Sequence, residues 1–477
     1  MKKIILLILI SLFIKSNTAQ EPYWKITHIG WGTQLVQKGD TLVTIGTGAD
    51  ENYLAGFQLN KYLLYGTLIS QWYFKHDSTL FDLATTGINS NMSLTEMQNG
   101  DYLWGGLCGW VYDSIPGAGT IKREQGLSPM KSISTEKDVL QRTNAVVFRL
   151  NKDLDSIKSV KVFSPFYFYS SIEMIYEKHP DTLLVLLKEN IDGPVLYPRL
   201  IETDSLFNIR WDRKLYLQNG YLHPQSFIAL PDGGYFLLFH LEPDMTSSVH
   251  YNDCKQVLVK ISSTGDIKLL KYIGDIEHFL NSNSYMIELN DGNYLATYTD
   301  YAKLIDVGWG INATPNEDCT LWFLKLNSNG ETLSTSNIRQ YLSWVLPFFV
   351  PESEQCFRTT GISRANDGDI LISGYHSNRH QRGFLLKIGQ ENLVPKWIRC
   401  YEIDKENYST PSNKCIPGKA YQLTDGSFAF HGCFHSFPSV IYPNGMTGAL
   451  LIKTDKFGCL EPGCQEHDGV EEFDLTS

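Results

Sequence analysis

The sequence lacks the signatures by which many enzymes and metal proteins are recognised. It contains no Gly-x-Ser-x-Gly nucleophile elbow and no Cys-x-x-Cys metal knuckle. The Ser-x-Asp-x-Gly-x-x-Trp boxes of sialidase propellers and the Ala-x-Asp-x-x-Thr-Gly signature of quinoprotein propellers are also missing. Carboxylates are plentiful, so their presence alone does not select glycoside hydrolysis. These absences favour a non-catalytic protein and predict neither a cofactor nor a metal.

The chain also lacks a cluster of basic residues. It has 41 Lys and Arg against 52 Asp and Glu, a net charge of −11, and the acidic residues are scattered singly. Phosphate backbones are bound by basic patches. We therefore do not expect a nucleic-acid partner.

Long apolar stretches are absent apart from residues 4–14, which are interrupted only by Ser11 and preceded by Lys2 and Lys3. The stretch is about half of the roughly 20 residues that a membrane-spanning helix needs. A short apolar run after basic residues is typical of a signal peptide. We predict a signal peptide over residues 1–19, cleaved after Ala19, and a secreted or cell-surface mature chain without a membrane span.

What the sequence does contain is a repeated hairpin, seen most clearly where Pro231-Asp232-Gly233 separates two apolar segments. Gly, Asn and Asp favour tight turns because they adopt positive φ at little cost. Seven such turns occur, at residues 38–40, 99–101, 179–181, 231–233, 290–292, 366–368 and 424–426.

Each turn is followed by an apolar second strand, a third strand and a fourth strand. In the third strand a basic residue alternates with apolar ones, as in 258–261, so this strand is expected to be half exposed. The fourth often carries an aromatic residue, namely Trp72, Trp211, Tyr272, Tyr341 or Trp397. Four strands per unit, with almost no helical periodicity, predict an all-β, seven-bladed β-propeller over residues 20–464 and a short acidic tail over 465–477. Separate hairpin domains and an open β-solenoid are the alternatives.

The two ends of the chain favour a closed ring. Residues 24–30 resemble a fourth strand such as 396–401, yet they precede the first hairpin, whereas the last unit stops after its third strand at Cys459. We predict that the N-terminal strand closes the last blade by pairing with residues 449–454. An unclosed ring would leave strand edges open to aggregation.

The segment Leu450-Leu-Ile-Lys-Thr-Asp-Lys-Phe-Gly-Cys459, with Pro462-Gly463-Cys464 and Gly469-Val-Glu-Glu472, resembles exported bacterial β-propeller proteins that use type IX secretion. In that family a sorting domain follows the final acidic linker. This sequence stops at Ser477, so the resemblance implies a truncated product or another route out of the cell.

Nine cysteines in an exported chain suggest disulfides with one thiol left over. We predict a disulfide between Cys459 and Cys464, because the intervening Pro-Gly turn brings them together. The sequence assigns no pairing to the other seven.

Long connections between second and third strands, at residues 106–143, 242–255, 300–319 and 433–447, are predicted to share one face. Binding commonly resides in long loops on a rigid scaffold. The candidate ligand-binding residues there are Trp110, Tyr112, Trp309, His376 and His435. The pairs His376/His380 and His431/His435 have zinc-like spacing, but we interpret them as loop histidines. The expected function is a non-catalytic scaffold that binds an extracellular protein or glycan; the alternative is a glycan-active hydrolase or lyase.

Overall fold

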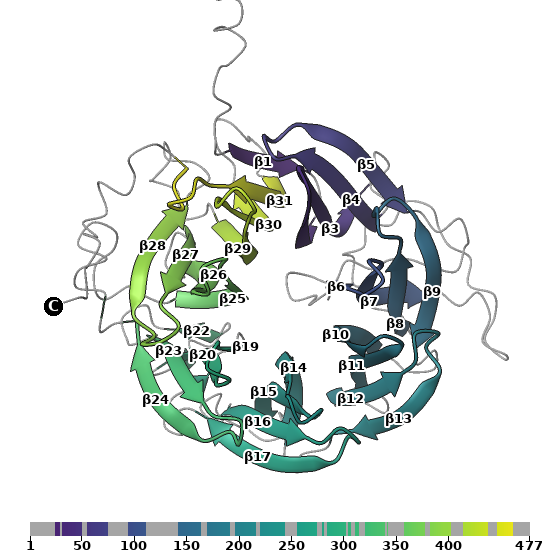
Figure 1. Ribbon diagram of the computed structural model, residues 1–477, viewed down its shortest axis with the longest axis vertical. Helices are drawn as coiled ribbons and strands as arrows, with labels where there is room; N and C mark the ends of the chain where they lie inside the picture. Colours follow the sequence, from purple (N-terminus) through teal and green to yellow (C-terminus); the bar gives the residue numbers. More distant parts are fainter. Residues whose placement is uncertain are drawn as a thin grey trace, which may run out of the picture.

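Seven tight hairpins divide the chain into blades arranged in a ring (Figure 1). The computed structural model describes residues 24–28, 31–49, 55–74, 94–110, 142–163, 169–190, 196–215, 220–243, 255–273, 279–280, 284–301, 304–306, 311–313, 320–338, 341, 357–376, 382–401, 414–436 and 446–460. The predicted signal peptide and acidic tail lie outside these residues, and both remain predictions.

The first four blades each contain four consecutive antiparallel strands, ordered from the ring axis outward. Blade 1 contains β2 (Trp31–Lys38), β3 (Thr41–Ala49), β4 (Ala55–Leu63) and β5 (Leu68–Phe74). Blade 2 contains β6 (Leu94–Glu96), β7 (Tyr102–Trp110), β8 (Arg142–Leu150) and β9 (Ile157–Phe163). Blade 3 contains β10 (Tyr169–His179), β11 (Thr182–Asn190), β12 (Leu196–Thr203) and β13 (Ile209–Lys214). Blade 4 contains β14 (Gly220–Ala229), β15 (Tyr235–Pro243), β16 (Lys255–Ile261) and β17 (Ile267–Ile273).

The last three blades complete the ring. In blade 5, β18 (Phe279–Leu280) and β19 (Tyr285–Glu288) both pair with β20 (Tyr294–Tyr301), followed by β23 (Thr320–Leu326) and β24 (Thr332–Asn337). A small hairpin, β21 (Leu304–Asp306) and β22 (Ile311–Ala313), lies in its second connection. Blade 6 contains β25 (Phe357–Arg364), β26 (Ile370–His376), β27 (Arg382–Ile388) and β28 (Pro395–Tyr401). Blade 7 contains β29 (Lys414–Gln422), β30 (Phe428–Ser436), β31 (Met446–Lys453) and the N-terminal β1 (Trp24–His28).

The ring closes as the sequence predicts. Strand β1 pairs antiparallel with β31, with Trp24 opposite Lys453 and His28 opposite Ala449. Seven apolar clusters, one between each pair of neighbouring blades, form the core. The seven-bladed β-propeller prediction is therefore confirmed. Of the five aromatic residues predicted on fourth strands, Tyr341 alone lies beyond its strand, after β24.

All seven predicted hairpins connect a first strand to a second strand. Each contains a residue with positive φ: six are glycines, such as Gly233 at 78°, and in blade 3 Asp181 occupies this conformation at 68°. A non-glycine residue rarely adopts it, but Asp tolerates it better than most. The turn chemistry therefore accounts for the repeat.

A carboxylate at the hairpin pairs with a basic residue of the third strand in five blades. The pairs are Asp101–Arg149, Asp232–Lys260, Asp291–Lys325, Asp367–Lys387 and Asp425–Lys453. The prediction of half-exposed third strands is wrong, because β16 and β23 are mostly buried between neighbouring blades. The alternating basic residue marks an ion pair with the turn, not exposure to solvent.

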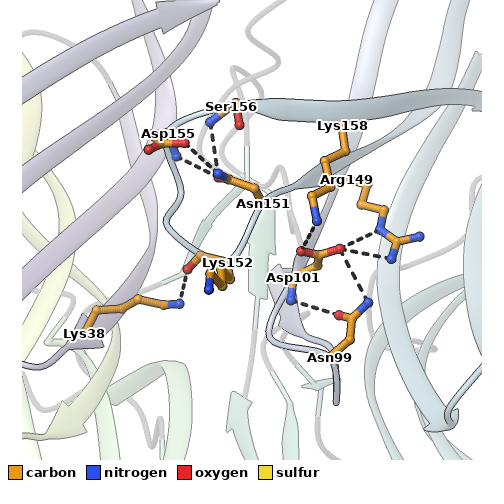
Figure 2. A network of polar contacts seen from close by, with 9 residues as sticks. All are labelled: Lys38, Asn99, Asp101, Arg149, Asn151, Lys152, Asp155, Ser156 and Lys158. Carbon is orange, nitrogen blue, oxygen red and sulfur yellow. Dashed lines mark hydrogen bonds and ion pairs between the residues drawn. The ribbon is translucent and has the colours of Figure 1, made fainter.

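Blade 2 shows the most buried of these ion pairs (Figure 2). Asp101 lies between Arg149, whose Nη2 is 3.0 Å from Oδ2, and Lys158, whose Nζ is 2.7 Å from Oδ1. Nearby, Lys38 of blade 1 donates to the backbone carbonyl of Lys152, which links the two blades.

The antiparallel order gives the ring two distinct ends. The seven hairpins, together with the turns between third and fourth strands, lie at one end, which we call the turn face. The connections between second and third strands and those between blades lie at the other end, the loop face. Among the described residues, none forms a helix long and apolar enough to cross a bilayer.

Candidate functional site

The inner strands carry a repeated irregularity. In β2, β10, β14, β25 and β29 the pairing with the second strand shifts register about halfway along. The residues left outside the ladder are Thr33, Glu173, Gln225, Thr360 and the pair Gly418 and Lys419. A bulge adds one or more residues to one strand and re-aims a side chain. Its recurrence in five blades makes it a feature of the fold.

We call four of these residues, Glu173, Gln225, Thr360 and Lys419, the axial set. Each lies on the innermost strand of its blade, the strand nearest the ring axis (Figure 1). Glu173 is buried, Gln225 and Thr360 are half-buried, and Lys419 is exposed. The set therefore places a carboxylate, an amide and an ammonium group on the inner strands, together with the hydroxyl of Thr360, whose oxygen is buried.

Glu173 is a buried carboxylate with a defined partner. Its side chain is 8% exposed, and Oε1 accepts a hydrogen bond of 2.7 Å from Oγ of Ser171. A buried carboxylate is costly unless it is hydrogen-bonded. Ser171 therefore positions it within the inner strand.

A row of polar side chains crosses blade 4. His223 of β14 is opposite His240 of β15, which is opposite Gln256 of β16. The two imidazole rings are 6.0 Å apart; His240 is buried and His223 is half-buried. Leu238 and Leu258, on the same side of the sheet, pack against blade 5. The row therefore lies in the seam between blades 4 and 5, on the loop-face half of the strands.

Two cations lie on the inner strands of blades 6 and 7, each over an aromatic ring. The guanidinium of Arg358 lies 5.8 Å from the ring centre of Tyr375, and its Nη1 donates to the Tyr375 hydroxyl at 3.3 Å. Nζ of Lys419 lies 5.3 Å from the ring centre of Tyr421. Such contacts hold a cation in place while leaving it able to meet an anion.

The carboxylates with shifted pKa values lie away from this site. The backbone N–H of Gly234 lowers the pKa of Asp232, and Lys325 lowers the pKa of Asp291 to about 2. For Asp101, burial raises the pKa, but hydrogen bonds from Lys158 and Arg149 outweigh it, so the net shift is downward. All six described carboxylates whose pKa departs from its usual value have it lowered, and all lie in turn-face turns. The turn-face carboxylates are thus stabilised as anions, which suits a structural role.

The sequence-predicted site residues are spread over several blades. Trp110 ends β7, His376 ends β26, and His435 lies one residue from the end of β30, all toward the loop face. The side chains of these three residues lie outside the described part of the structure, as do Tyr112 and Trp309 altogether. Their role in binding remains a prediction.

One histidine of the predicted pairs is not a loop residue. His431 lies in the middle of β30 and is 2% exposed, so its interpretation as a loop histidine is wrong. Among the described residues, no three His, Cys, Asp or Glu side chains gather as metal ligands.

The cysteines divide into two groups. Among the described residues, Cys400, Cys415 and Cys433 are not disulfide-bonded. Cys459 is buried and is not one of these three, whereas Cys464 lies outside the described residues. The Cys459–Cys464 disulfide remains a prediction.

The axial set was missed from sequence, although a local signal exists. The alternation of apolar and polar residues that is typical of a strand is interrupted at Pro224-Gln225 and at Pro417-Gly418-Lys419. Proline and glycine inside a strand often mark a bulge. Reading these breaks as bulges would have identified two of the four residues.

Fold and site together define a seven-bladed β-propeller with polar residues on its inner strands. No known protein family and no curated protein matches the sequence. Among solved structures, a polysaccharide lyase of family PL25, an ulvan lyase bound to -[GlcA(1-4)Rha3S]-, is similar over 89% of this chain and 95% of its own, with 8% identity and a TM-score of 0.50.

Two further solved structures are more distant. A Mycobacterium tuberculosis puromycin-hydrolyzing peptidase has 10% identity over 92% of this chain and 53% of its own, with a TM-score of 0.46. The NanB sialidase of Streptococcus pneumoniae has 12% identity over 90% of this chain and 68% of its own, with a TM-score of 0.39. The propellers similar to this chain thus include glycan-active enzymes; at such identities the likeness concerns the fold alone.

Proposed function

We propose that this protein recognises a glycan at the loop face and at the axial surface, the surface formed by the inner strands around the ring axis. The protein does not alter the glycan chemically. The observation that supports this is the axial set. The carboxylate, amide and ammonium groups of the set donate and accept the hydrogen bonds that sugar hydroxyls need. A ring of rigid strands presents them in fixed positions, which reduces the entropy lost on binding.

The described carboxylates favour binding over hydrolysis. A hydrolase of the usual kind needs two carboxyl groups flanking the bond, one with a raised pKa to act as acid. Within the described residues, the pKa shifts of the carboxylates are all downward and lie on the turn face, whereas the axial set contributes Glu173 alone. We therefore prefer a recognition scaffold.

A glycan-active hydrolase or lyase is the second candidate. It is favoured by His223, a half-buried imidazole beside His240, because histidine is the commonest proton-transfer group at neutral pH. It also agrees with the kinds of protein that share this propeller fold.

A binding screen followed by a product assay separates the two. The mature chain is applied to a glycan array, and each bound polysaccharide is then incubated with it and assayed for new reducing ends and for ultraviolet absorbance from unsaturated sugars. We expect binding without products. Products that disappear with His223→Ala would establish the enzyme instead, and an array without any bound glycan would contradict both.

We also propose that the protein acts outside the cell, after cleavage near Ala19. Residues 2–14 and the resemblance to type IX secretion substrates support this. N-terminal sequencing of the exported protein should begin at Gln20; a retained Met1 would contradict it. If the array shows no binding, a surface-protein pull-down tests a protein partner.

A further inference from the structure

Two cations, Arg358 and Lys419, lie on the inner strands β25 and β29 of neighbouring blades, and their positions suit a negatively charged ligand. Arg358, Tyr375 and Gly383 lie opposite one another across β25, β26 and β27. A Cβ at Gly383 would lie 2.7 Å from Cγ of Pro417 in β29. This row therefore faces the inner strand of blade 7, and Arg358 lies in the seam between blades 6 and 7.

The backbone of Lys419 borders this seam, whereas its ammonium group lies over Tyr421, which packs against the cluster between blades 7 and 1. A Cβ at Gly361 would lie 2.5 Å from Cα of Lys419, so the absence of a side chain in β25 lets the bulge of β29 pack directly on it. Oγ of Ser363 donates to the carbonyl of Ala420, which fixes the two inner strands together. Gly361 is three residues from Arg358 in β25. At roughly 3.3 Å per residue, the two positions are separated by about 10 Å along the strand.

The pairing of charges distinguishes Lys419 from the turn-face lysines. On the turn face, Lys260, Lys325 and Lys453 each contact a carboxylate. Lys419 contacts the Tyr421 ring and has no ion pair among the described residues, although the chain as a whole carries a net charge of −11. An exposed, positioned cation on an axial strand of an acidic protein is suited to attract an anion.

We infer that the ligand is an acidic polysaccharide, and that Arg358 and Lys419 hold carboxylate or sulfate groups on it. Arg358 forms directional hydrogen bonds to planar anions, whereas Lys419 supplies a compact charge. Tyr375 and Tyr421 keep both cations in place and offer ring faces beside them. This inference rests on the proposed function, because it names the class of glycan bound.

The test compares a charged polymer with its neutral counterpart. Binding of polygalacturonate and of carboxyl-reduced polygalacturonate is measured by calorimetry with the mature protein and with Lys419→Gln, Lys419→Arg and Arg358→Gln. The matched control is Lys456→Gln, because Lys456 also lies over an aromatic ring, Phe457 at 5.0 Å, but on the turn face of the same blade. Melting curves confirm that each variant is folded.

We expect Lys419→Gln to weaken polygalacturonate binding by about tenfold or more, as loss of a charge-assisted contact does. Binding of the reduced polymer should not change, Lys419→Arg should retain affinity, and salt should weaken wild-type binding. Arg358→Gln, if folded, should behave like Lys419→Gln.

Equal affinities for the two polymers, or an equal loss from Lys456→Gln, would overturn the inference. If the array shows neutral glycans bound and acidic ones ignored, this inference fails while the proposed function stands. If no glycan is bound, both fail.

Discussion

Replacing Asp101 with Asn tests the argument that the hairpin carboxylates stabilise each blade by pairing with its outer strands. The change keeps the shape of the side chain and removes its charge. It weakens the contacts to Arg149 and Lys158 while Asn99 still accepts from the backbone N–H of residue 101 at 2.9 Å. The Asp101 side chain is 4% exposed, so these partners, and not water, stabilise its negative charge.

The expected loss follows from how exposed the partners are. Removing one member of a buried ion pair costs about 3–5 kcal/mol. Arg149 and Lys158 have side chains that are 20% and 50% exposed, so both regain water when the carboxylate is lost. We therefore expect Asp101→Asn to lower the free energy of unfolding by about 2–3 kcal/mol.

The matched control is Asp40→Asn, at the same turn position in blade 1, where the Asp side chain is exposed. It should change stability by no more than about 0.5 kcal/mol. The measurement is urea unfolding followed by tryptophan fluorescence, comparing midpoints at constant slope. If Asp101→Asn and Asp40→Asn unfold at the same urea concentration, the ion-pair argument is refuted.

Three other predictions concern the whole propeller. Because the pKa of Asp291 is lowered to about 2 in the fold, its contribution to stability is present above the unfolded value near pH 4 and is lost as pH falls toward 2; Lys325→Met should reduce this acid dependence in urea titrations between those pH values. Burial raises the pKa of Cys433 to about 12, so its labelling by a thiol reagent at pH 8 should be slow until the protein is unfolded, and rapid labelling of the native protein would contradict its burial. Deleting residues 20–30 removes β1 and should lower the melting temperature sharply; a deletion variant that melts like the parent would mean that this strand does not secure the ring.

The architecture was predictable because its determinants are local. Residues such as Gly233 and Gly426 mark hairpins through positive φ, and the resulting repeat gives blade number and strand order. The closing strand was predictable too, since the two ends of the chain complement one another. The third strands were misjudged because Lys453 looks like a surface residue in sequence, whereas it is 6% exposed beside Asp425. Sequence alternation shows where a charge falls but not whether another segment neutralises it.

The candidate site was much less predictable. A bulge shifts register by one or two residues, and Glu173 within a run of apolar residues carries no mark of it. The contact of Gly361 with Lys419 joins two blades, and no local sequence pattern encodes contacts between blades. Prediction from sequence therefore turned to loop residues such as Trp110 and Trp309 and overlooked the inner strands.

The most direct test of glycan recognition at the axial surface is a comparison of binding by two sets of substitutions. One variant combines Gln225→Ala and Lys419→Ala; the other combines Asp40→Ala and Lys456→Ala on the turn face. Each is measured by calorimetry against the tightest glycan from the array, after melting curves show that both are folded. The account predicts that the axial variant loses binding and the turn-face variant retains it; binding that survives in the axial variant and is lost in the turn-face variant would contradict it.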